Sequence, residues 1–115
     1  MQLNHFVPEE FTRCNPPCSI SQMNEEFMIL LDCARADSGV PFVLNCAFRS
    51  VEYDKRKGRS GTSFHTLGRA VDIRCTDSYT RSKILQYCLR YGLSCGISKT
   101  FIHVDNRPNQ LVFLY

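Results

Sequence analysis

The chain is organised around one stretch, Ser63-Phe64-His65-Thr66-Leu67-Gly68-Arg69-Ala70-Val71-Asp72-Ile73. We expect His65 where a loop ends, and Gly68 permits a backbone turn that a β-carbon would hinder. After this turn, Ala70–Ile73 places Asp72 between apolar neighbours, which predicts a short strand. The stretch therefore predicts a loop, a turn and a strand that together present an imidazole and a carboxylate.

A second histidine follows in Phe101-Ile102-His103-Val104-Asp105. Its alternation predicts another strand, with His103 and Asp105 on one face. Two neighbouring strands that each offer a ligand from the same face can hold a metal ion rigidly. Two imidazoles and one carboxylate, from His65, Asp72 and His103, are the ligand set of an open catalytic zinc site that leaves a fourth position for water. We expect one Zn2+ per chain.

These motifs resemble those of a known family. The pattern Ser-x-His-x-x-Gly-x-Ala-x-Asp, from Ser63 to Asp72, is similar to the signature of the zinc D-Ala-D-Ala carboxypeptidases and peptidoglycan endopeptidases. Phe48-Arg49-Ser50 resembles the Tyr-Arg-Ser element of that family, and Thr100–Asp105 resembles its last ligand strand. The similarity extends from Phe6 to Arg107. It implies the hedgehog/DD-peptidase fold, which phage endolysins share.

The resemblance also implies an activity, the hydrolysis of a peptide bond in peptidoglycan stem peptides. The bond is either the one cut by a D-Ala-D-Ala carboxypeptidase or the one cut by an L-Ala-D-Glu endopeptidase. Zinc would activate water as the nucleophile and polarise the scissile carbonyl. Arg49 matches the arginine that holds an acidic group of the substrate through parallel hydrogen bonds, unless it forms a structural salt bridge. Ser63 resembles the family serine that contacts the substrate peptide.

The general base is the weak point of this assignment. Many relatives carry Asp or Glu three residues before the last histidine ligand, where this chain has Thr100, which cannot accept the proton. Asp105 is the nearest candidate, either as the base or as a group that orients a ligand imidazole or Arg107. Thr100 also supports an alternative function, a non-catalytic zinc-binding or cell-wall-binding domain of the same fold. A thiol-dependent enzyme has little support, because no cysteine has an obvious histidine partner in a turn.

Length and composition predict one soluble globular domain over residues 1–115, with an irregular N-terminal arm over 1–21. The net charge of +3 is too small for a nucleic-acid-binding patch, and the longest apolar run, Phe27–Leu31, is too short to span a membrane. The first residues lack the apolar core of a secretory signal. We therefore expect synthesis in the cytoplasm, action on the cell wall after release, and a monomer whose partner is a peptidoglycan peptide.

The seven cysteines are an odd number, so at least one is unpaired. Buried thiols in a reducing compartment are the main interpretation, with Cys33 and Cys88 in the core. Cys14 and Cys18 are the alternative, as a disulfide or a second metal clip. The basic run Lys55–Arg59 is interpreted as a solvated loop rather than a site for a polyanion.

Periodicity and turn residues predict an α+β domain in which two principal helices flank a mainly antiparallel sheet. The first helix is expected to be capped by Ser21 and ended by Gly39, and the second to be capped by Thr76 or Asp77. The expected elements are helices over Gln22–Asp37 and Ser78–Tyr91, strands over Pro41–Phe48, Ala70–Ile73, Phe101–Asp105 and Gln110–Tyr115, a turn or short strand over Ser94–Ile97, and a polar loop over Glu52–Thr62.

Overall fold

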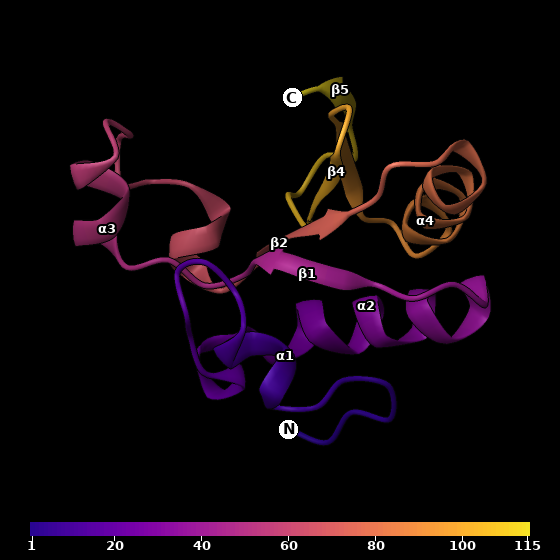
Figure 1. Cartoon of the computed structure of the whole chain (residues 1–115), viewed down its shortest axis with the longest axis horizontal. Coiled ribbons are helices and arrows are strands. Elements are labelled where there is room, and N and C mark those ends of the chain that lie inside the picture. Colours follow the sequence, from indigo (N-terminus) through magenta and orange to yellow (C-terminus); the bar gives the residue numbers. More distant parts are fainter.

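The computed structural model describes residues 1–115 and contains a five-stranded sheet in the order β1-β2-β4-β3-β5 (Figure 1). Neighbouring strands run antiparallel except for β3 and β5, which run parallel. The prediction of an α+β fold with a mainly antiparallel sheet is therefore confirmed. The strands are β1 (Val43–Cys46), β2 (Ala70–Arg74), β3 (Ser94–Ile97), β4 (Phe101–Asp105) and β5 (Val112–Leu114).

Two long helices, α2 (Glu25–Ser38) and α4 (Ser78–Arg90), pack against each other and against one face of the sheet. Asp77 caps α4 by accepting a hydrogen bond from the backbone N–H of Thr80, as one of the two expected caps. The helix ends at Arg90, one residue before the expected end. Because the helices cover only one face, the other face of the sheet is left for a site.

The expected start of the first helix, Gln22 with Ser21 as its cap, is wrong. Residues Ile20–Gln22 form a separate 3-10 turn, η1, and Asn24 caps α2 through a hydrogen bond from the N–H of Phe27. The backbone N–H of Asn24 bonds to the carbonyl of Gly68, so the chain is held extended there and cannot enter the helix earlier. The helix ends at Ser38, one residue beyond the expected Asp37, and Gly39 follows it with a φ of 70°, as expected of the residue that ends the helix.

The polar loop expected over Glu52–Thr62 is wrong in its first half, where the structure has a helix, α3 (Val51–Arg56). Ser50 caps this helix by accepting a hydrogen bond from the N–H of Tyr53. Asp54, within the same helix, is a buried acid that anchors the helix to the domain. The N-terminal arm, which was expected to be irregular, contains one short helix, α1 (Glu9–Thr12).

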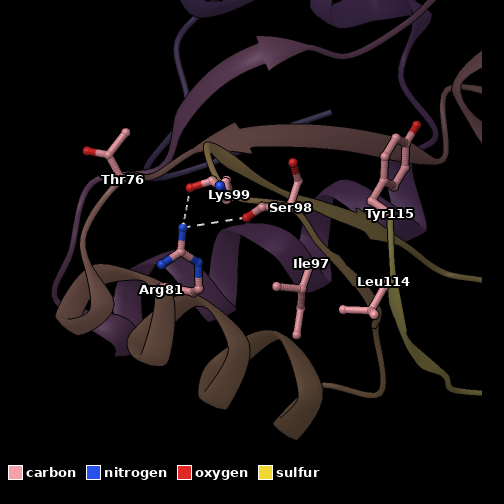
Figure 2. Close-up of a pocket in the computed structure, with 7 residues that line it drawn as sticks. All are labelled: Thr76, Arg81, Ile97, Ser98, Lys99, Leu114 and Tyr115. Atoms are coloured by element: carbon pink, nitrogen blue, oxygen red, sulfur yellow. Dashed lines mark hydrogen bonds between the residues drawn. The ribbon is translucent and has the colours of Figure 1, made fainter.

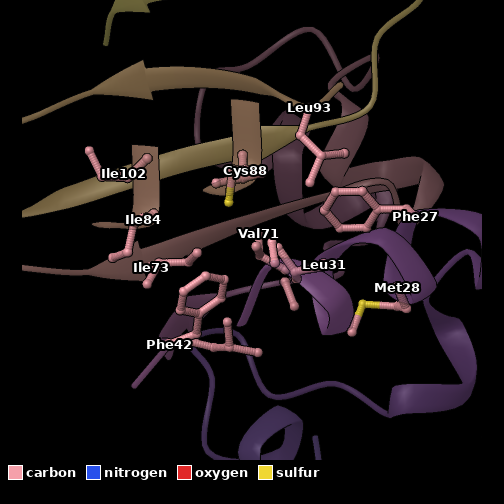
Figure 3. Close-up of a cluster of buried hydrophobic side chains, with 14 of the residues drawn as sticks. Phe27, Met28, Leu31, Phe42, Val71, Ile73, Ile84, Cys88, Leu93 and Ile102 are labelled. Atoms are coloured by element: carbon pink, nitrogen blue, oxygen red, sulfur yellow. The ribbon is translucent and has the colours of Figure 1, made fainter. Parts of the chain in front are cut away.

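The hydrophobic core lies between the sheet and the two long helices (Figure 3). Val71 and Ile73 of β2 face it together with Ile102 and Val104 of β4, and all four are fully buried. Because side chains alternate along a strand, this arrangement turns the intervening residues to the opposite face. Truncating one such core side chain to alanine typically costs about 2–5 kcal/mol. From the helices and the adjoining segments, Figure 3 labels Phe27, Met28, Leu31, Phe42, Ile84, Cys88 and Leu93.

The end of the chain differs in detail from the expectation. The last strand, β5, covers Val112–Leu114 and not the whole of Gln110–Tyr115, because the Gln110 side chain donates to the carbonyls of Leu89 and Leu93 and so joins the chain to the end of α4. None of the helices has the length and apolar character that crossing a membrane requires.

Candidate metal centre

The face of the sheet opposite the helices carries a row of paired residues. Asp72 of β2 pairs with His103 of β4, and His103 pairs in turn with Gly96 of β3. On the other side, Asp72 pairs with Cys46 of β1. Cross-strand partners on one face bring their side chains within contact distance. The sheet register therefore gathers an imidazole, a carboxylate and a thiol.

The second imidazole comes from the 3-10 turn η2 (Phe64–Leu67), which Gly68 closes with a φ of 68°. A β-carbon on Gly68 would lie 2.3 Å from the carbonyl oxygen of Gln22, so the turn requires glycine both for its backbone angle and for this close approach. This close approach of Gly68 to the backbone of Gln22 places His65 over β2. Its Nδ1 bonds to the carbonyl of Ala47 at 2.7 Å, which leaves Nε2 facing Oδ1 of Asp72 at 3.3 Å.

His103 is held in the same manner. Its Nε2 bonds to Oδ2 of Asp105 at 2.7 Å, and its Nδ1 faces Oδ1 of Asp72 at 3.1 Å. One oxygen of Asp72 therefore lies between the two imidazoles, whose ring centroids are 5.2 Å apart. All the side chains that the sequence suggested as metal ligands lie together, although they come from a turn and two different strands.

The chemistry of these donors fits a metal ion such as zinc. The Nε2 atom of His65 is buried and has no hydrogen-bond partner, which is costly for a polar atom unless a ligand satisfies it. In each imidazole the nitrogen that points away from Asp72 is occupied by a protein oxygen, an arrangement typical of ligand histidines. Donor atoms of Cys46, His65 and Asp72 also lie within 4.8 Å of one another. The group is therefore a candidate metal centre.

In the metal-free protein, the same residues also interact with one another through their charges. Burial opposes a charge on His65, but its contacts with Asp72 and Cys46 outweigh burial and raise its pKa to about 9. Burial alone would raise the pKa of Asp72, whereas the two histidines lower it to about 2. A protonated His65 thus balances the carboxylate at neutral pH. A metal cation would take over this role and displace the proton.

Asp105 is fully buried and both of its carboxylate oxygens are engaged. Besides the bond to His103, it accepts hydrogen bonds from Nε of Arg107 at 2.9 Å and from Nη2 at 2.6 Å. Burial by itself raises the pKa of Asp105, but these partners hold the pKa below the usual carboxyl range. The carboxylate is therefore placed to orient the imidazole of His103, and neither oxygen is free.

Arg49 and Ser63, the two residues suggested as substrate contacts, lie in a shared network with Asp54. Nε of Arg49 is 2.8 Å from Oδ1 of Asp54 in a buried ion pair that is too bent for a hydrogen bond. The Ser63 hydroxyl donates to Oδ2 of the same carboxylate at 2.8 Å and accepts from Nη2 of Arg49 at 3.4 Å. The salt-bridge alternative for Arg49 is therefore the contact that the structure contains.

A cavity of about 280 Å³ lies beside the row. The one carboxylate in its wall is Asp72, and two arginines, Arg49 and Arg59, bring positive charge to it. Of these, Arg49 is already balanced by Asp54, whereas Arg59 has no acidic partner. The lining residues are Asn15, Asn45, Cys46, Arg49, Tyr53, Arg59, Asp72, Phe101 and Tyr115.

Tyr115 lines both this cavity and a larger one of about 710 Å³, whose lining Figure 2 shows. In the larger cavity, Nη2 of Arg81 is occupied by the carbonyls of Ser98 and Lys99, so this arginine stabilises loops and is not free for a ligand. The ring of Tyr115 lies 5.1 Å from that of His103. Gly96 leaves room for the ring of Phe113, because a β-carbon at Gly96 would lie 2.5 Å from that ring.

The profile of the Peptidase M15 family matches residues 4–105. This chain belongs to the peptidase M15 family. A solved structure, the L-Ala D-Glu endopeptidase ChiX of Serratia marcescens, is similar to this M15 peptidase in fold, with a TM-score of 0.52 and 18% sequence identity. The match covers 83% of the M15 chain and 86% of the ChiX chain. No curated protein matched the sequence.

Two residues of the centre were missed by sequence reasoning. Asp54 fell in the expected loop, although the Ser50 cap ahead of it signalled a helix. Cys46 fell within the expected strand Pro41–Phe48 and received no role of its own, and strict alternation would place it on the core face with Leu44. A register shift between these two residues turns Cys46 to the face of Asp72 instead. Such a bulge has no clear signal in the sequence.

Proposed function

We propose that this M15 peptidase is a zinc-dependent hydrolase that cleaves a peptide bond in peptidoglycan stem peptides. One observation carries the proposal: His65 Nε2 and His103 Nδ1 both face Oδ1 of Asp72, and the buried Nε2 has no other partner. These three residues would hold Zn2+ as the metal ligands. When bound, the ion supplies a Lewis acid that activates water and polarises the scissile carbonyl.

The protein's own groups would prepare this centre. Ala47 and Asp105 hold the two imidazoles in the tautomers that present a free nitrogen to the ion. We assign Asp105 this orienting role and not that of general base, because both of its oxygens are already engaged. Thr100 cannot replace it, and the cavity wall has no carboxylate other than Asp72. Proton removal from water would therefore depend mainly on the metal ion.

Substrate would enter the cavity beside Asp72, with a carboxylate of the stem peptide facing the arginines. Arg49 lines the cavity, although its Nε is paired with Asp54. Ser63 bonds to the same carboxylate and holds that pair in position. Arg59 adds a charge that no acid of the chain balances. An acidic peptide is therefore favoured over a neutral one. The peptide bond cut is that of a D-Ala-D-Ala carboxypeptidase or of an L-Ala-D-Glu endopeptidase.

Two measurements test the proposal together. The first is the metal content of the purified chain and of His65→Ala, with His5→Ala as a control that removes an exposed histidine. We expect one zinc per chain, lost only in His65→Ala. The second is mass spectrometry of muropeptides incubated with the zinc-loaded chain, which identifies the bond from the masses of the products. Absence of site-specific zinc would contradict the proposal.

A non-catalytic zinc-binding or cell-wall-binding domain is the competing function, and one observation favours it. Thr100 stands where relatives carry an acid, and the structure supplies no replacement carboxylate in the cavity. Muropeptide cleavage that a chelator abolishes and zinc restores would exclude this alternative. Zinc binding without any cleavage, combined with retention of the chain on peptidoglycan, would establish it instead.

A further inference from the structure

The bulge in β1 directs Cys46 to the metal centre. Val43 pairs with Arg74 and Leu44 with Ile73, so that Leu44 faces the core. The register then shifts by one residue at Asn45, which reverses the direction of the next side chain. Cys46 consequently pairs with Asp72 on the opposite face. Without the bulge, its thiol would lie in the hydrophobic core with Leu44.

The thiol lies among donor atoms that a metal ion would use. Sγ of Cys46, a ring nitrogen of His65 and an oxygen of Asp72 are within 4.8 Å of one another. Sγ also lies 3.8 Å from Nδ1 of His65, which is the ring nitrogen that bonds to Ala47 and not the one that faces Asp72. Ligand atoms around a tetrahedral zinc are about 3.3–3.6 Å apart, so the side chains must move closer together when the ion binds. Nδ1 of His65 already bonds to Ala47 at 2.7 Å, so the thiol is not required as its partner.

A second observation, on His65, also indicates that a ligand binds between these donor atoms. Nε2 of His65 is aimed at Asp72, on a residue that is 1% exposed, and it makes no hydrogen bond. Cys46 is 6% exposed and lines the cavity next to Asp72. The thiol of Cys46, on β1, and the unpartnered nitrogen of His65, in η2, thus both lie beside Asp72, which lines the cavity.

We propose that Cys46 supplies a thiolate as a further ligand of the metal ion bound by His65, Asp72 and His103. This inference rests on the proposed function, because it adds a ligand to the same site. On binding, the Sγ–H bond breaks, its proton goes to solvent, and the sulfur lone pair forms the bond to the metal. With the thiolate bound, four protein ligands surround the ion, as in a closed zinc site.

A sulfur ligand has two consequences for the centre. Thiolate is a soft ligand, so it favours zinc over magnesium, calcium or manganese. It also occupies the position that water takes in an open catalytic site, so substrate or water must displace Cys46 or add a fifth ligand. The resting form of this M15 peptidase is therefore a four-coordinate site that opens on substrate binding.

X-ray absorption at the zinc edge tests the ligand directly and does not depend on activity. The reduced chain is loaded with one equivalent of zinc, alongside Cys46→Ser, His65→Ala and a control, Cys75→Ser. Cys75 is similarly buried at the end of β2 and belongs to no donor cluster. We expect one sulfur at about 2.3 Å from zinc in wild type and in the control, replaced by nitrogen or oxygen at about 2.0–2.2 Å in Cys46→Ser. Zinc affinity should fall at least about tenfold in Cys46→Ser.

The outcomes separate this inference from the proposed function. Zinc bound at a site that His65→Ala abolishes, with only nitrogen and oxygen ligands in wild type, overturns the Cys46 ligand and leaves the proposed function standing. Sulfur coordination of zinc that persists in Cys46→Ser also overturns the Cys46 ligand, because another cysteine then holds the ion. Zinc binding that is equal in wild type and His65→Ala overturns both. Even if a variant does not fold, a wild-type spectrum without sulfur overturns the Cys46 ligand.

Discussion

Asp105 accepts a hydrogen bond from Nε2 of His103 at 2.7 Å, and neither side chain is more than slightly exposed. Arg107 occupies the rest of the carboxylate, so this pair is closed to water and to substrate. The contact determines which nitrogen of His103 faces Asp72. Asp105, two positions beyond His103 on the same strand, therefore orients this imidazole, and both of its oxygens are engaged.

Removing the charge at this position should weaken metal binding. We expect Asp105→Asn to lower zinc affinity by about 10- to 100-fold, because the imidazole of His103 loses the carboxylate that orients it. Competition with a chelator of known affinity measures the change. Glu26→Gln, an exposed acid on α2, is the control and should leave the affinity unchanged. Unchanged zinc affinity in Asp105→Asn, with loss of the limb of the pH–rate profile that reports the base, would show that Asp105 is the base.

The ion pair of Arg49 should be costly to break. Asp54 is fully buried, so Asp54→Ala leaves the guanidinium of Arg49 without a counter-charge, and we expect the free energy of unfolding to fall by about 3–5 kcal/mol. Urea unfolding measures it. On the same helix, Glu52→Ala removes an exposed acid and should change stability by no more than about 0.5 kcal/mol. Equal effects of the two substitutions would mean that the pair does not hold α3 in place.

Gly68 and Gly39 form a matched pair for a steric test. Their φ angles are 68° and 70°, so alanine is strained by about 1–2 kcal/mol at either position. Only at Gly68 would the new β-carbon meet the carbonyl of Gln22, whereas nothing lies within 4 Å at Gly39. We expect Gly68→Ala to be about 1–3 kcal/mol less stable than Gly39→Ala in thermal or urea unfolding, and to bind zinc more weakly. Equal stability of the two variants would contradict the close approach.

The raised pKa of His65 makes the metal-free protein sensitive to pH. The folded-state pKa is about 9 against a usual value of 6.5, so the charged ring stabilises the fold fully below 6.5 and this contribution is lost as pH rises through 9. We expect unfolding free energy in chelator to fall by a few kcal/mol between about pH 6.5 and pH 9, at about 1.4 kcal/mol per pKa unit. Urea titrations across this range measure it.

His65→Ala isolates the histidine in this experiment, because all the other titratable groups are present in both proteins. The fall in stability that wild type shows in excess of the variant belongs to His65. Asp72 behaves in the opposite sense: its pKa of about 2 against 3.8 gives stability that is present above 3.8 and lost as pH falls through 2. Parallel pH profiles for wild type and His65→Ala between 6.5 and 9 would contradict the raised pKa.

Local sequence patterns were sufficient to predict part of this fold. The alternation in Phe101–Asp105 predicts both a strand and the shared face of His103 and Asp105, and Gly68 predicts the turn before β2. These features depend on neighbouring residues, because a strand repeats every two residues and a positive φ favours glycine. The donor set of His65, Asp72 and His103 could be named for the same reason, from residue type and spacing.

Contacts between distant segments decided the rest. The helix start at Glu25 depends on a backbone bond between Asn24 and Gly68, which the sequence of the helix does not contain. Arg49 pairs with Asp54, and the Ser63 hydroxyl from the loop after α3 bonds to the same carboxylate. The position of Cys46 depends on a one-residue bulge that local alternation contradicts.

The sequence by itself thus determined the turn and the strands that carry His65, Asp72 and His103, since these elements follow from short-range periodicity and turn residues. The tertiary structure alone decided which of the remaining groups reach the centre, because a register shift of a single residue reverses a side chain between the core and the site.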